Sequence, residues 1–265
     1  MIIQYIRIPV LILYFFTLLF GADCINSLEV KLWGECYNIQ TTTKLHLSGI
    51  GLEGEIPIEI GSLRNLYSID LSNNQLSGKI PSEIGGLINL FFLYLQDNQL
   101  SGDIPFEIGN LTNLNRLFLS GNKFFGRIPV EIGNLKKLEY LYLFKNRFSG
   151  EIPKSIGDLT ELFKLDLSSN QLSGEIPSII GNLTKLNSLR LFNNQLVGEI
   201  PSSINNLVEL EFLFLHKNQL SGGIPPGICN QENLNIGLEN NQLCPPYPTC
   251  ISDTNIKSQD ILHCP

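Results

Sequence analysis

The chain has 265 residues with 25 acidic and 18 basic side chains, so its formal net charge at pH 7 is −7. This acidic balance argues against nucleic acid and other anionic polymers as main partners, because proteins bind those polymers through clusters of Lys and Arg. The length is sufficient for a long continuous core.

Residues 1–22 differ from the rest of the chain. Arg7 precedes an apolar run from Ile8 to Phe20, and the small residues Gly21 and Ala22 follow it. The run has the length of a secretory h-region and is shorter than the ~18 residues of a membrane span. It predicts a cleaved signal peptide over 1–22, with an uncleaved anchor as the alternative. Loss of Arg7 would take the charge from −7 to −8.

Residues 23–41 come before the regular part of the chain. This segment contains Leu28, Leu32 and Trp33 together with Cys24 and Cys36. An uncovered first coil of a repeat array would leave apolar groups in water, so a terminal segment must cover it. We therefore interpret 23–41 as an N-terminal cap.

A 24-residue period dominates residues 42–243. Self-similarity of this kind predicts a solenoid, in which each unit buries its apolar side only by stacking on its neighbours. The recurring prolines of an Ile-Pro pair are Pro57, Pro81, Pro105, Pro129, Pro153, Pro177, Pro201 and Pro225. The recurring asparagines are Asn74, Asn98, Asn122, Asn146, Asn170, Asn194, Asn218 and Asn241.

Each of about nine units carries two apolar residues separated by one other residue. Alternation with period two predicts a short strand with both apolar residues turned inward. The pairs are Leu45/Leu47, Ile69/Leu71, Leu93/Leu95, Leu117/Leu119, Leu141/Leu143, Leu165/Leu167, Leu189/Leu191, Leu213/Leu215 and Ile236/Leu238. Because every unit repeats the same strand, we expect one parallel sheet along one wall of the coil.

The other signature positions predict how each unit turns. The asparagine amide can bond backbone groups of its own and adjacent turns where the chain leaves the strand. Glycines such as Gly78 tolerate the positive φ that a tight turn needs. Ile-Pro restrains one φ angle on the opposite wall, and the spacing of Ile60, Leu63 and Leu66 predicts a single helical or 3-10 turn after it.

The repeat ends at residue 243. The interval from Asn218 to Asn241 is 23 residues, and Cys244-Pro245-Pro246 stands where the glycine and Ile-Pro signals are expected. Residues 244–265 are rich in proline and cysteine, and we interpret them as a C-terminal cap.

The cysteines lie only at the two ends of the chain. A disulfide needs Cα atoms within about 7 Å, whereas nine strands spaced ~4.8 Å apart separate the ends by roughly 40 Å. The pattern therefore predicts a Cys24–Cys36 disulfide and leaves three pairings open for the other four. These are Cys229, Cys244, Cys250 and Cys264. A metal site is disfavoured, because no C-x-x-C pair is present and a secretory route favours disulfides.

Residues 66–90 read LYSIDLSNNQLSGKIPSEIGGLINL and fill the pattern LxxLxxLxLxxNxLxGxIPxxIGxLxx. The chain resembles the plant-type class of leucine-rich-repeat proteins, which includes ectodomains of receptor kinases, receptor-like proteins and polygalacturonase inhibitors. Trp33 to Cys36 resembles the amino-terminal cap of that class. The resemblance covers 42–243 and implies an α/β solenoid, with a right-handed coil, a concave parallel β-sheet, short helical turns on the convex side and disulfide-bonded caps.

Nine aromatic residues occupy strand positions that flank the inward pairs and point out of the concave wall. Tyr94, Phe118 and Tyr142 share one column in three adjacent strands, so we expect a contiguous ladder. Exposed apolar patches of this kind mark interaction sites, and aromatic anchors supply contact area at low entropic cost. The nine are Phe92, Tyr94, Phe118, Tyr140, Tyr142, Phe144, Phe192, Phe212 and Phe214.

Three charged residues among them, Arg116, Arg190 and Asp166, are candidates for orienting a polar ligand. The alternative for the whole face is that the rings only stabilise the sheet by stacking across strands. Two sequons, at Asn110 and Asn182, fall at the same unit position on the outer wall and predict glycosylation in a secreted chain.

No catalytic or metal-binding constellation stands out. His46, His216 and His263 lie in three different places, the serines and glycines fall in repeat slots, and Glu55, Glu151, Glu175 and Glu199 form a column expected to be solvated. We therefore expect no enzyme activity, cofactor or metal.

The sequence predicts a secreted, monomeric recognition module that binds an extracellular protein, peptide or glycan through its concave face. Inhibition of a secreted cell-wall-degrading glycosidase is one alternative. A passive surface or matrix spacer and a partner of a membrane receptor are the others.

Overall fold

The computed structural model describes residues 24, 26–231, 233–262 and 264. The predicted signal peptide lies outside the described residues. Among the described residues, none of the helices combines the length and apolar character needed to cross a membrane.

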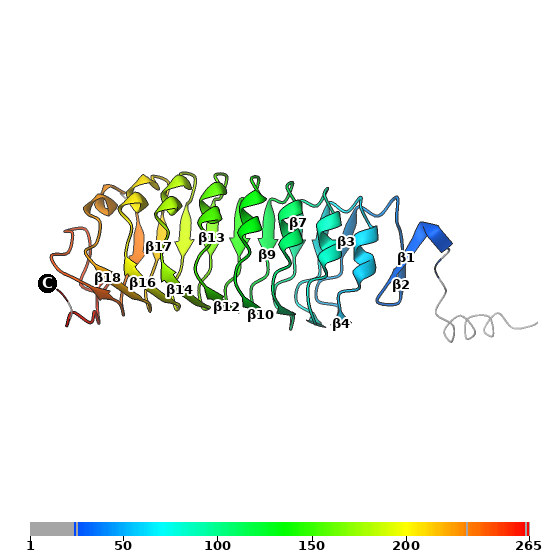
Figure 1. Cartoon of the computed structure of the whole chain (residues 1–265), viewed down its shortest axis with the longest axis horizontal. Coiled ribbons are helices and arrows are strands. Elements are labelled where there is room, and N and C mark those ends of the chain that lie inside the picture. The colour runs from blue at the N-terminus through cyan, green and yellow to red at the C-terminus, as the bar shows by residue number, and fades with distance from the viewer. Residues whose placement is uncertain (1–23, 25, 232, 263, 265) are drawn as a thin grey trace, which may run out of the picture.

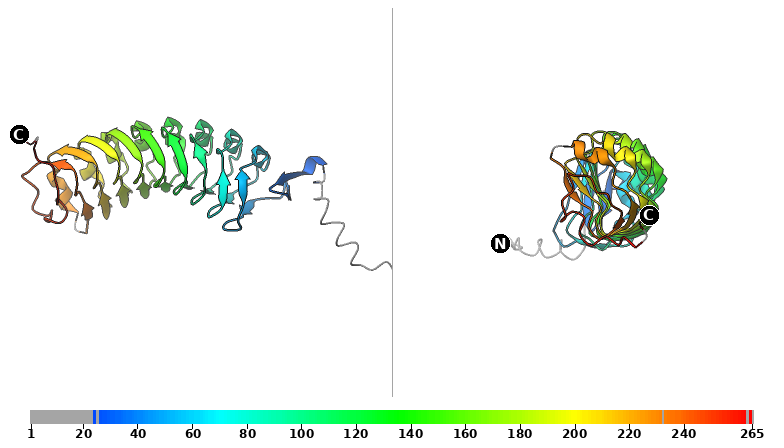
Figure 2. Two further views of the ribbon diagram at one scale, coloured as in Figure 1. Left: turned by 90° about the horizontal axis from the view of Figure 1, so that it is seen from below. Right: turned by 90° about the vertical axis from the view of Figure 1, so that its left-hand side faces the viewer.

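The chain forms one elongated coil, bent into an arc with a nine-stranded parallel sheet on its inner side (Figure 2). Neighbouring strands pair in register, so that residues 24 apart in the sequence lie side by side over most of the sheet. The strands are β3 (Lys44–His46), β5 (Ser68–Asp70), β7 (Phe92–Tyr94), β9 (Arg116–Phe118), β11 (Tyr140–Tyr142), β13 (Lys164–Asp166), β15 (Ser188–Arg190), β17 (Phe212–Phe214) and β19 (Asn235–Gly237). This sheet is the one that the alternating apolar pairs predict.

A second series of short parallel strands forms an adjoining wall, as a seven-stranded sheet and a separate β4–β6 pair (Figure 1). Most of its strands start three residues before the recurring glycine of their unit, as β12 does before Gly150. Its strands are β4 (Glu53–Glu55), β6 (Gln75–Ser77), β8 (Ser101–Gly102), β10 (Lys123–Gly126), β12 (Arg147–Gly150), β14 (Gln171–Glu175), β16 (Gln195–Glu199), β18 (Gln219–Gly222) and β20 (Gln242–Leu243).

Short 3-10 helices follow the Ile-Pro pairs and line the outer side of the arc (Figure 2). Each proline precedes its helix with an extended backbone, as Pro81 does at φ −68° and ψ 143°. These helices are η2 (Ile58–Ser62), η3 (Ser82–Gly86), η4 (Phe106–Asn110), η5 (Val130–Asn134), η6 (Lys154–Asp158), η7 (Ser178–Asn182), η8 (Ser202–Asn206) and η9 (Pro226–Asn230). The predicted single turn on the opposite wall is therefore a 3-10 turn.

The core runs through the coil as stacked columns of leucine and isoleucine. Leu141 and Leu143 of one unit, for example, have no exposed surface. Full burial of such a side chain stabilises the fold by about 1.5–3 kcal/mol. Because the same positions repeat in every unit, the core is continuous from Leu45 to Leu243.

A column of buried asparagines joins successive coils. The Nδ2 group of Asn146 donates to the carbonyls of Leu119 (2.9 Å) and Leu143 (3.1 Å), and its Oδ1 accepts from the Phe124 amide (3.0 Å). Equivalent bonds recur along the coil, for instance at Asn98 and Asn218. Each asparagine thus satisfies buried backbone groups of its own coil and of the preceding one, which holds the strands in register.

At the N-terminal end, an antiparallel hairpin covers the first coil. It consists of β1 (Glu29–Leu32) and β2 (Glu35–Asn38), preceded by η1 (Asn26–Leu28). Leu32 is fully buried, and the indole Nε1 of Trp33 donates to the Glu55 carbonyl at 3.2 Å. Cys24 and Cys36 are joined by a disulfide, the pair expected from the sequence.

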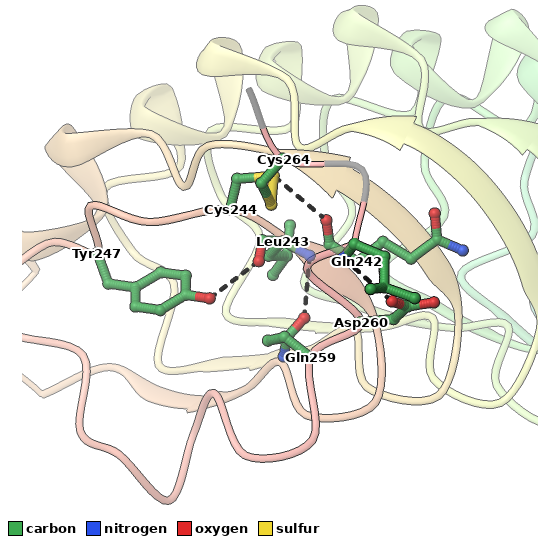
Figure 3. Close-up of a disulfide and its surroundings, with 8 residues drawn as sticks. Gln242, Leu243, Cys244, Tyr247, Gln259, Asp260 and Cys264 are labelled. Carbon is green, nitrogen blue, oxygen red and sulfur yellow. Dashed lines mark hydrogen bonds between the residues drawn. A yellow bond between two sulfur atoms is a disulfide. The ribbon is translucent and has the colours of Figure 1, made fainter.

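At the C-terminal end, the tail folds back over the last coil (Figure 3). The side chain of Gln259 accepts from the Leu243 amide at 3.0 Å, and the Asp260 amide donates to the Asn241 carbonyl at 2.8 Å. Disulfides join Cys229 to Cys250 and Cys244 to Cys264. Of the three pairings that the sequence left open, the structure contains this one.

Candidate functional site

The outward side chains of the nine-stranded sheet line the inner surface of the arc. Seven predicted aromatic residues lie within its strands, and Phe144 and Phe192 follow directly after β11 and β15. All nine are half-buried. Some rings pack on a ring of the adjacent strand, as Phe118 does on Tyr142, and others on a ring of their own strand, as Phe212 does on Phe214. The structure divides them into two groups, one over β7 to β11 and one at β15 and β17.

The predicted ladder forms in the first group. Ring centroids are 5.0 Å apart between Tyr94 and Phe118 and 4.5 Å apart between Phe118 and Tyr142, the second pair being stacked. Burial of its hydroxyl, followed by the nearby Asp166, raises the pKa of Tyr142. The Tyr142 hydroxyl is therefore neutral at pH 7.

The guanidinium of Arg116 lies between two rings of its own column, which runs beside the ladder. Its Cζ atom is 5.3 Å from the Phe92 centroid and 4.9 Å from the Tyr140 centroid. One Nη donates to the Tyr94 hydroxyl at 3.4 Å, while the buried Nε has no hydrogen-bond partner. Cation–π contacts of this kind contribute about 0.5–2 kcal/mol, and they hold a positive charge at the centre of the aromatic group.

Three further rings belong to this group and were missed by the sequence analysis. Tyr67 stacks on Phe91 at 5.3 Å, Phe91 meets Phe92 edge-on at 4.8 Å, and Phe163 contacts Tyr140 at 5.9 Å. Tyr67, Phe91 and Phe163 occupy one repeat position, immediately before each strand. A fourth column, at that position, would have revealed them.

The second group lies near the C-terminal end of the sheet. Phe192 stacks on His216 at 4.5 Å, and the Arg190 guanidinium lies over Phe214 at 5.3 Å and Phe212 at 6.0 Å. Burial lowers the pKa of His216, against an opposing effect of Glu239. The imidazole is therefore neutral at pH 7.

A hollow of about 330 Å³ separates the two aromatic groups. It lies over β13 and β15, where unit positions that carry rings elsewhere carry smaller or polar side chains. Asp166 is 9% exposed at its base, and burial raises the pKa of this carboxyl despite hydrogen bonds from Ser168. The lining residues are Tyr142, Phe144, Lys164, Leu165, Asp166, Ser188, Arg190 and Phe212.

A larger depression of about 930 Å³ lies away from this face, between β14, β16 and the 3-10 turns. Its walls are the repeat glutamates Glu151, Glu175 and Glu199 with Ile179 and Val197. Within the described part of the chain no aromatic residue lines it, and most of its lining residues are the Gly, Glu, Ile and Pro that recur at these positions in other units. The inner face is therefore the stronger candidate site.

The described residues contain one cluster with metal-ligand types, Cys24, Glu29 and Cys36, whose ligand atoms lie within 4.8 Å. Both of its sulfurs belong to a disulfide, so neither is a thiolate that could bind a metal. His46 lies on β3 and His216 follows β17, far apart along the sheet, and His263 is outside the described residues. Asn110 and Asn182 are exposed at the ends of η4 and η7, and their glycosylation stays a prediction.

Comparison with known proteins identifies the family to which this repeat architecture belongs. A family model for a leucine-rich repeat region matches residues 107–195, and a model for the single leucine-rich repeat matches 65–87, 89–111, 185–207 and 209–231. The chain is a leucine-rich repeat protein. Its repeats are of the plant type, in agreement with the resemblance seen in the sequence. None of the curated protein sequences matches the chain.

Solved ectodomains of plant receptor kinases are similar to this leucine-rich repeat protein. The ectodomain of GASSHO1/SCHENGEN3 from Arabidopsis thaliana, in complex with CASPARIAN STRIP INTEGRITY FACTOR 2, is 47% identical, with a TM-score of 0.74, over 75% of this chain and 24% of that one. The Arabidopsis receptor kinase HAESA, in complex with the peptide hormone IDA and the co-receptor SERK1, is 44% identical, with a TM-score of 0.72, over 74% and 33%.

A plant ice-binding protein is also similar, at 27% identity and a TM-score of 0.71 over 83% of this chain and 76% of that one. The chain thus spans between a quarter and a third of the two receptor ectodomains and most of the ice-binding protein. Because one repeat architecture serves such different roles, function has to be argued from the surface of this chain.

Proposed function

We propose that this leucine-rich repeat protein is an extracellular recognition module that binds a protein, peptide or glycan through the inner face of its arc. The observation that carries the proposal is the first aromatic group. Eleven ring and guanidinium contacts join the residues of this group from Tyr67 to Phe163, outside the pattern that the repeat requires.

The composition of this face is that of an interaction site. Aromatic and arginine side chains dominate the residues that contribute most to binding at protein interfaces. Arg116 lies within the aromatic group without an ion pair among the described residues. A ligand carbonyl or hydroxyl can accept from this cation, while the surrounding ring edges provide apolar contact.

The similar receptor ectodomains support the same role. The GASSHO1/SCHENGEN3 ectodomain is in complex with CASPARIAN STRIP INTEGRITY FACTOR 2, and HAESA is in complex with a peptide hormone and a co-receptor. We therefore include a small extracellular peptide and a membrane receptor among the partners expected for this chain. The disulfides at both ends support an extracellular location, because disulfides persist in oxidising compartments. No catalytic role is proposed.

The experiment is a binding screen of the protein, with residues 1–22 removed, against secreted proteins, peptides and oligosaccharides. The test variant is Y94S/F118S/Y142S, which removes the ladder. The matched control is I58S/F106S/V130S, which removes three exposed apolar side chains from the 3-10 turns, of 59%, 64% and 63% exposure.

A ligand bound through the inner face loses at least tenfold in affinity in the ladder variant and keeps its affinity in the control. Since a single hot-spot residue contributes at least about 2 kcal/mol, the loss of three should be well above tenfold. Equal binding by the wild type and the ladder variant would contradict the proposal. Circular dichroism spectra and melting temperatures establish that both variants are folded.

A further inference from the structure

The hollow between the two aromatic groups has its own chemistry. Tyr142 on β11 is paired with Asp166 on β13, and Phe212 on β17 is paired with Ser188 on β15. Because Asp166 and Ser188 are smaller than the paired aromatic side chains, they leave the space above β13 and β15 open. At about 330 Å³ its volume lies at the lower end of the ~300–1,000 Å³ range of small-molecule pockets. The site therefore suits one small group of a ligand.

An open aromatic face forms one wall. Within the ladder Phe118 lies between Tyr94 and Tyr142, so its two faces are covered by neighbouring rings. Tyr142 is the last ring of the ladder, and its strand neighbour on the other side is Asp166. Tyr142 lines the hollow, and within the described part of the chain Phe118 is the only ring that stacks on it, whereas Phe144 and Tyr140 contact it edge-on at 6.1 and 6.5 Å.

The base of the hollow presents a hydrogen-bond acceptor. Asp166 Oδ1 accepts from the Ser168 amide at 3.0 Å and from the Ser168 hydroxyl at 2.5 Å. For the other carboxylate oxygen, no hydrogen bond is found within the described part of the chain. This side chain is more than nine-tenths buried, and its remaining capacity to accept is directed to the hollow that it lines.

Donors face the same space. Arg190 is the strand neighbour of Asp166, yet the two form no ion pair within 4 Å in the described structure. Its guanidinium is instead drawn over Phe214 at 5.3 Å, with Nε donating to the Ser188 hydroxyl at 3.3 Å. Lys164 lines the hollow as well. One small space therefore offers an acceptor, several donors and an aromatic face.

Charges of both signs line the hollow, so a single ligand charge cannot complement Lys164, Arg190 and Asp166 together. A ligand cation would lie beside Lys164 and Arg190, and a ligand anion would lie beside the carboxylate of Asp166. An uncharged group that both donates and accepts hydrogen bonds can satisfy both kinds of side chain without burying a new charge. A sugar ring has this chemistry, since its hydroxyl groups donate and accept and its C–H face is apolar.

We propose that the hollow is a subsite for one neutral pyranose residue of an extracellular glycan. The C–H face of the sugar packs on Tyr142, its hydroxyl groups donate to Asp166, and Arg190 and Lys164 donate to its oxygens. The inference rests on the proposed function, because it identifies the ligand class of the same inner face. It commits to a glycan, and a peptide side chain in the hollow is the competing outcome.

The experiment measures binding of four neutral hexasaccharides, cellohexaose, laminarihexaose, xylohexaose and mannohexaose, by isothermal titration calorimetry. Hexagalacturonate and hexalysine serve as anionic and cationic probes. The test variants are D166N, which keeps the shape of the side chain, and Y142L. The matched control is D70N, because Asp70 forms the same bonds with Ser72, at 3.1 and 2.6 Å, outside the hollow.

We expect at least one neutral hexasaccharide to bind. Loss of a hydrogen bond to a charged acceptor is worth about 1.5–3 kcal/mol, so D166N should weaken that binding by roughly tenfold or more. Y142L should weaken it as well, and D70N should leave it unchanged. Melting temperatures close to that of the wild type establish that the variants are folded.

Failure to bind any of the four neutral hexasaccharides would overturn the inference, as would equal affinity in D166N. Tighter binding of hexagalacturonate or hexalysine than of every neutral probe would overturn it too, because the hollow would then select a charged group. These results remain distinct from failure of the proposed function. A secreted peptide or protein whose binding requires the ladder, but not Asp166, would uphold the inner face as a binding surface and reject the sugar subsite.

Discussion

The first and last coils of this leucine-rich repeat protein have similar strands but different neighbours. Beyond the last coil, the tail takes the place of another coil: the Leu238 and Asn240 amides donate to the carbonyls of Asn255 (3.0 Å) and Lys257 (3.2 Å). In the repeats the equivalent amides donate to the next strand, as Leu71 does to Tyr94.

The first coil is covered differently. The N-terminal hairpin packs on the core of the first coil. The strands of that coil nevertheless have exposed residues, which are Lys44, His46, Glu53 and Glu55. A methyl group added at Gly54 would meet nothing within 4 Å, whereas one added at Gly78, one coil later, would meet the side chain of Glu55 at 2.7 Å. The outer edge of the first coil is therefore open in the described structure.

The difference separates two requirements of an array end. Both ends bury the apolar core, which water would otherwise destabilise. In the described structure the C-terminal cap also accepts hydrogen bonds from strand amides of the last coil, whereas the N-terminal hairpin bonds the first coil through the Trp33 side chain. At the N-terminal end, strands of three residues with charged side chains make the edge a poor template for another strand. We therefore expect the same change to have different effects along the coil.

The largest effect is expected from the asparagine column. N146A leaves the Phe124 amide buried without its partner, at about 1–3 kcal/mol. It also removes one of the two asparagine hydrogen bonds to each of the Leu119 and Leu143 carbonyls, at about 1 kcal/mol each, while Asn122 and Asn170 still donate to them. We expect it to lower the unfolding free energy by about 4 kcal/mol, measured by urea denaturation.

The matched variant at the open end is N74A. Asn74 accepts from the Ile50 and Leu52 amides, but Ile50 is 61% exposed, so water can replace part of the lost bonding. The expected loss is about half that of N146A. Equal losses would show that the first coil is closed to water in solution.

The second effect concerns the disulfides. C244S/C264S opens a loop with a sequence separation of 20, and a loop of about this size stabilises a fold by about 3 kcal/mol. Because the tail is then free to leave the last coil, we expect faster amide hydrogen exchange at Leu238 and Asn240. C24S/C36S opens a loop of only 12 and should leave exchange at these two amides unchanged.

The third effect isolates one side chain of the C-terminal cap. Gln259 accepts from the Leu243 amide and donates to the Leu238 carbonyl at 2.9 Å. We expect Q259A to lower the stability of the last coil by about 1–2 kcal/mol, detected as faster exchange of the Leu243 amide. K257A is the control, because Lys257 bonds Asn240 through its backbone carbonyl, and it should change nothing.

The smallest effect is a pH dependence near the closed end. Burial lowers the pKa of His216 in the folded chain, so the unfolded chain takes up a proton at higher pH than the folded one. The contribution of neutral His216 to the free energy of unfolding is fully present above about pH 6.5 and is lost as the pH falls below that value. An NMR titration should show the lowered pKa of His216, and F192A, which removes the stacked ring, should move it back toward the ordinary value. A titration unaffected by F192A would contradict this cause.

Most of the fold could be predicted from the sequence. The inward pairs such as Leu141 and Leu143, the asparagine column and the 3-10 turn after Ile-Pro all follow from local patterns that recur every 24 residues. The repeat also placed Tyr94, Phe118 and Tyr142 in one column. Their contact required only that parallel strands pair in register, which the period imposes.

Other features could not be predicted in this way. The pairing of Cys229 with Cys250 and of Cys244 with Cys264 depends on a non-repeating tail, for which spacing leaves several pairings open. The rings of Tyr67 and Phe91 join the aromatic group from a position outside the strands, where an alternation argument does not reach. The predicted boundaries of the caps at 41 and 244 stay predictions.

By itself the sequence determined the repeating coil, its inner sheet and the concentration of aromatic residues on that sheet. It could do so because each of these depends on the pattern within one unit and on the identity of successive units. Only the tertiary structure decided that Arg190 turns toward Phe214 and leaves Asp166 without an ion pair at the base of a hollow. That choice depends on competing contacts between side chains on three adjacent strands, and no single unit encodes their outcome.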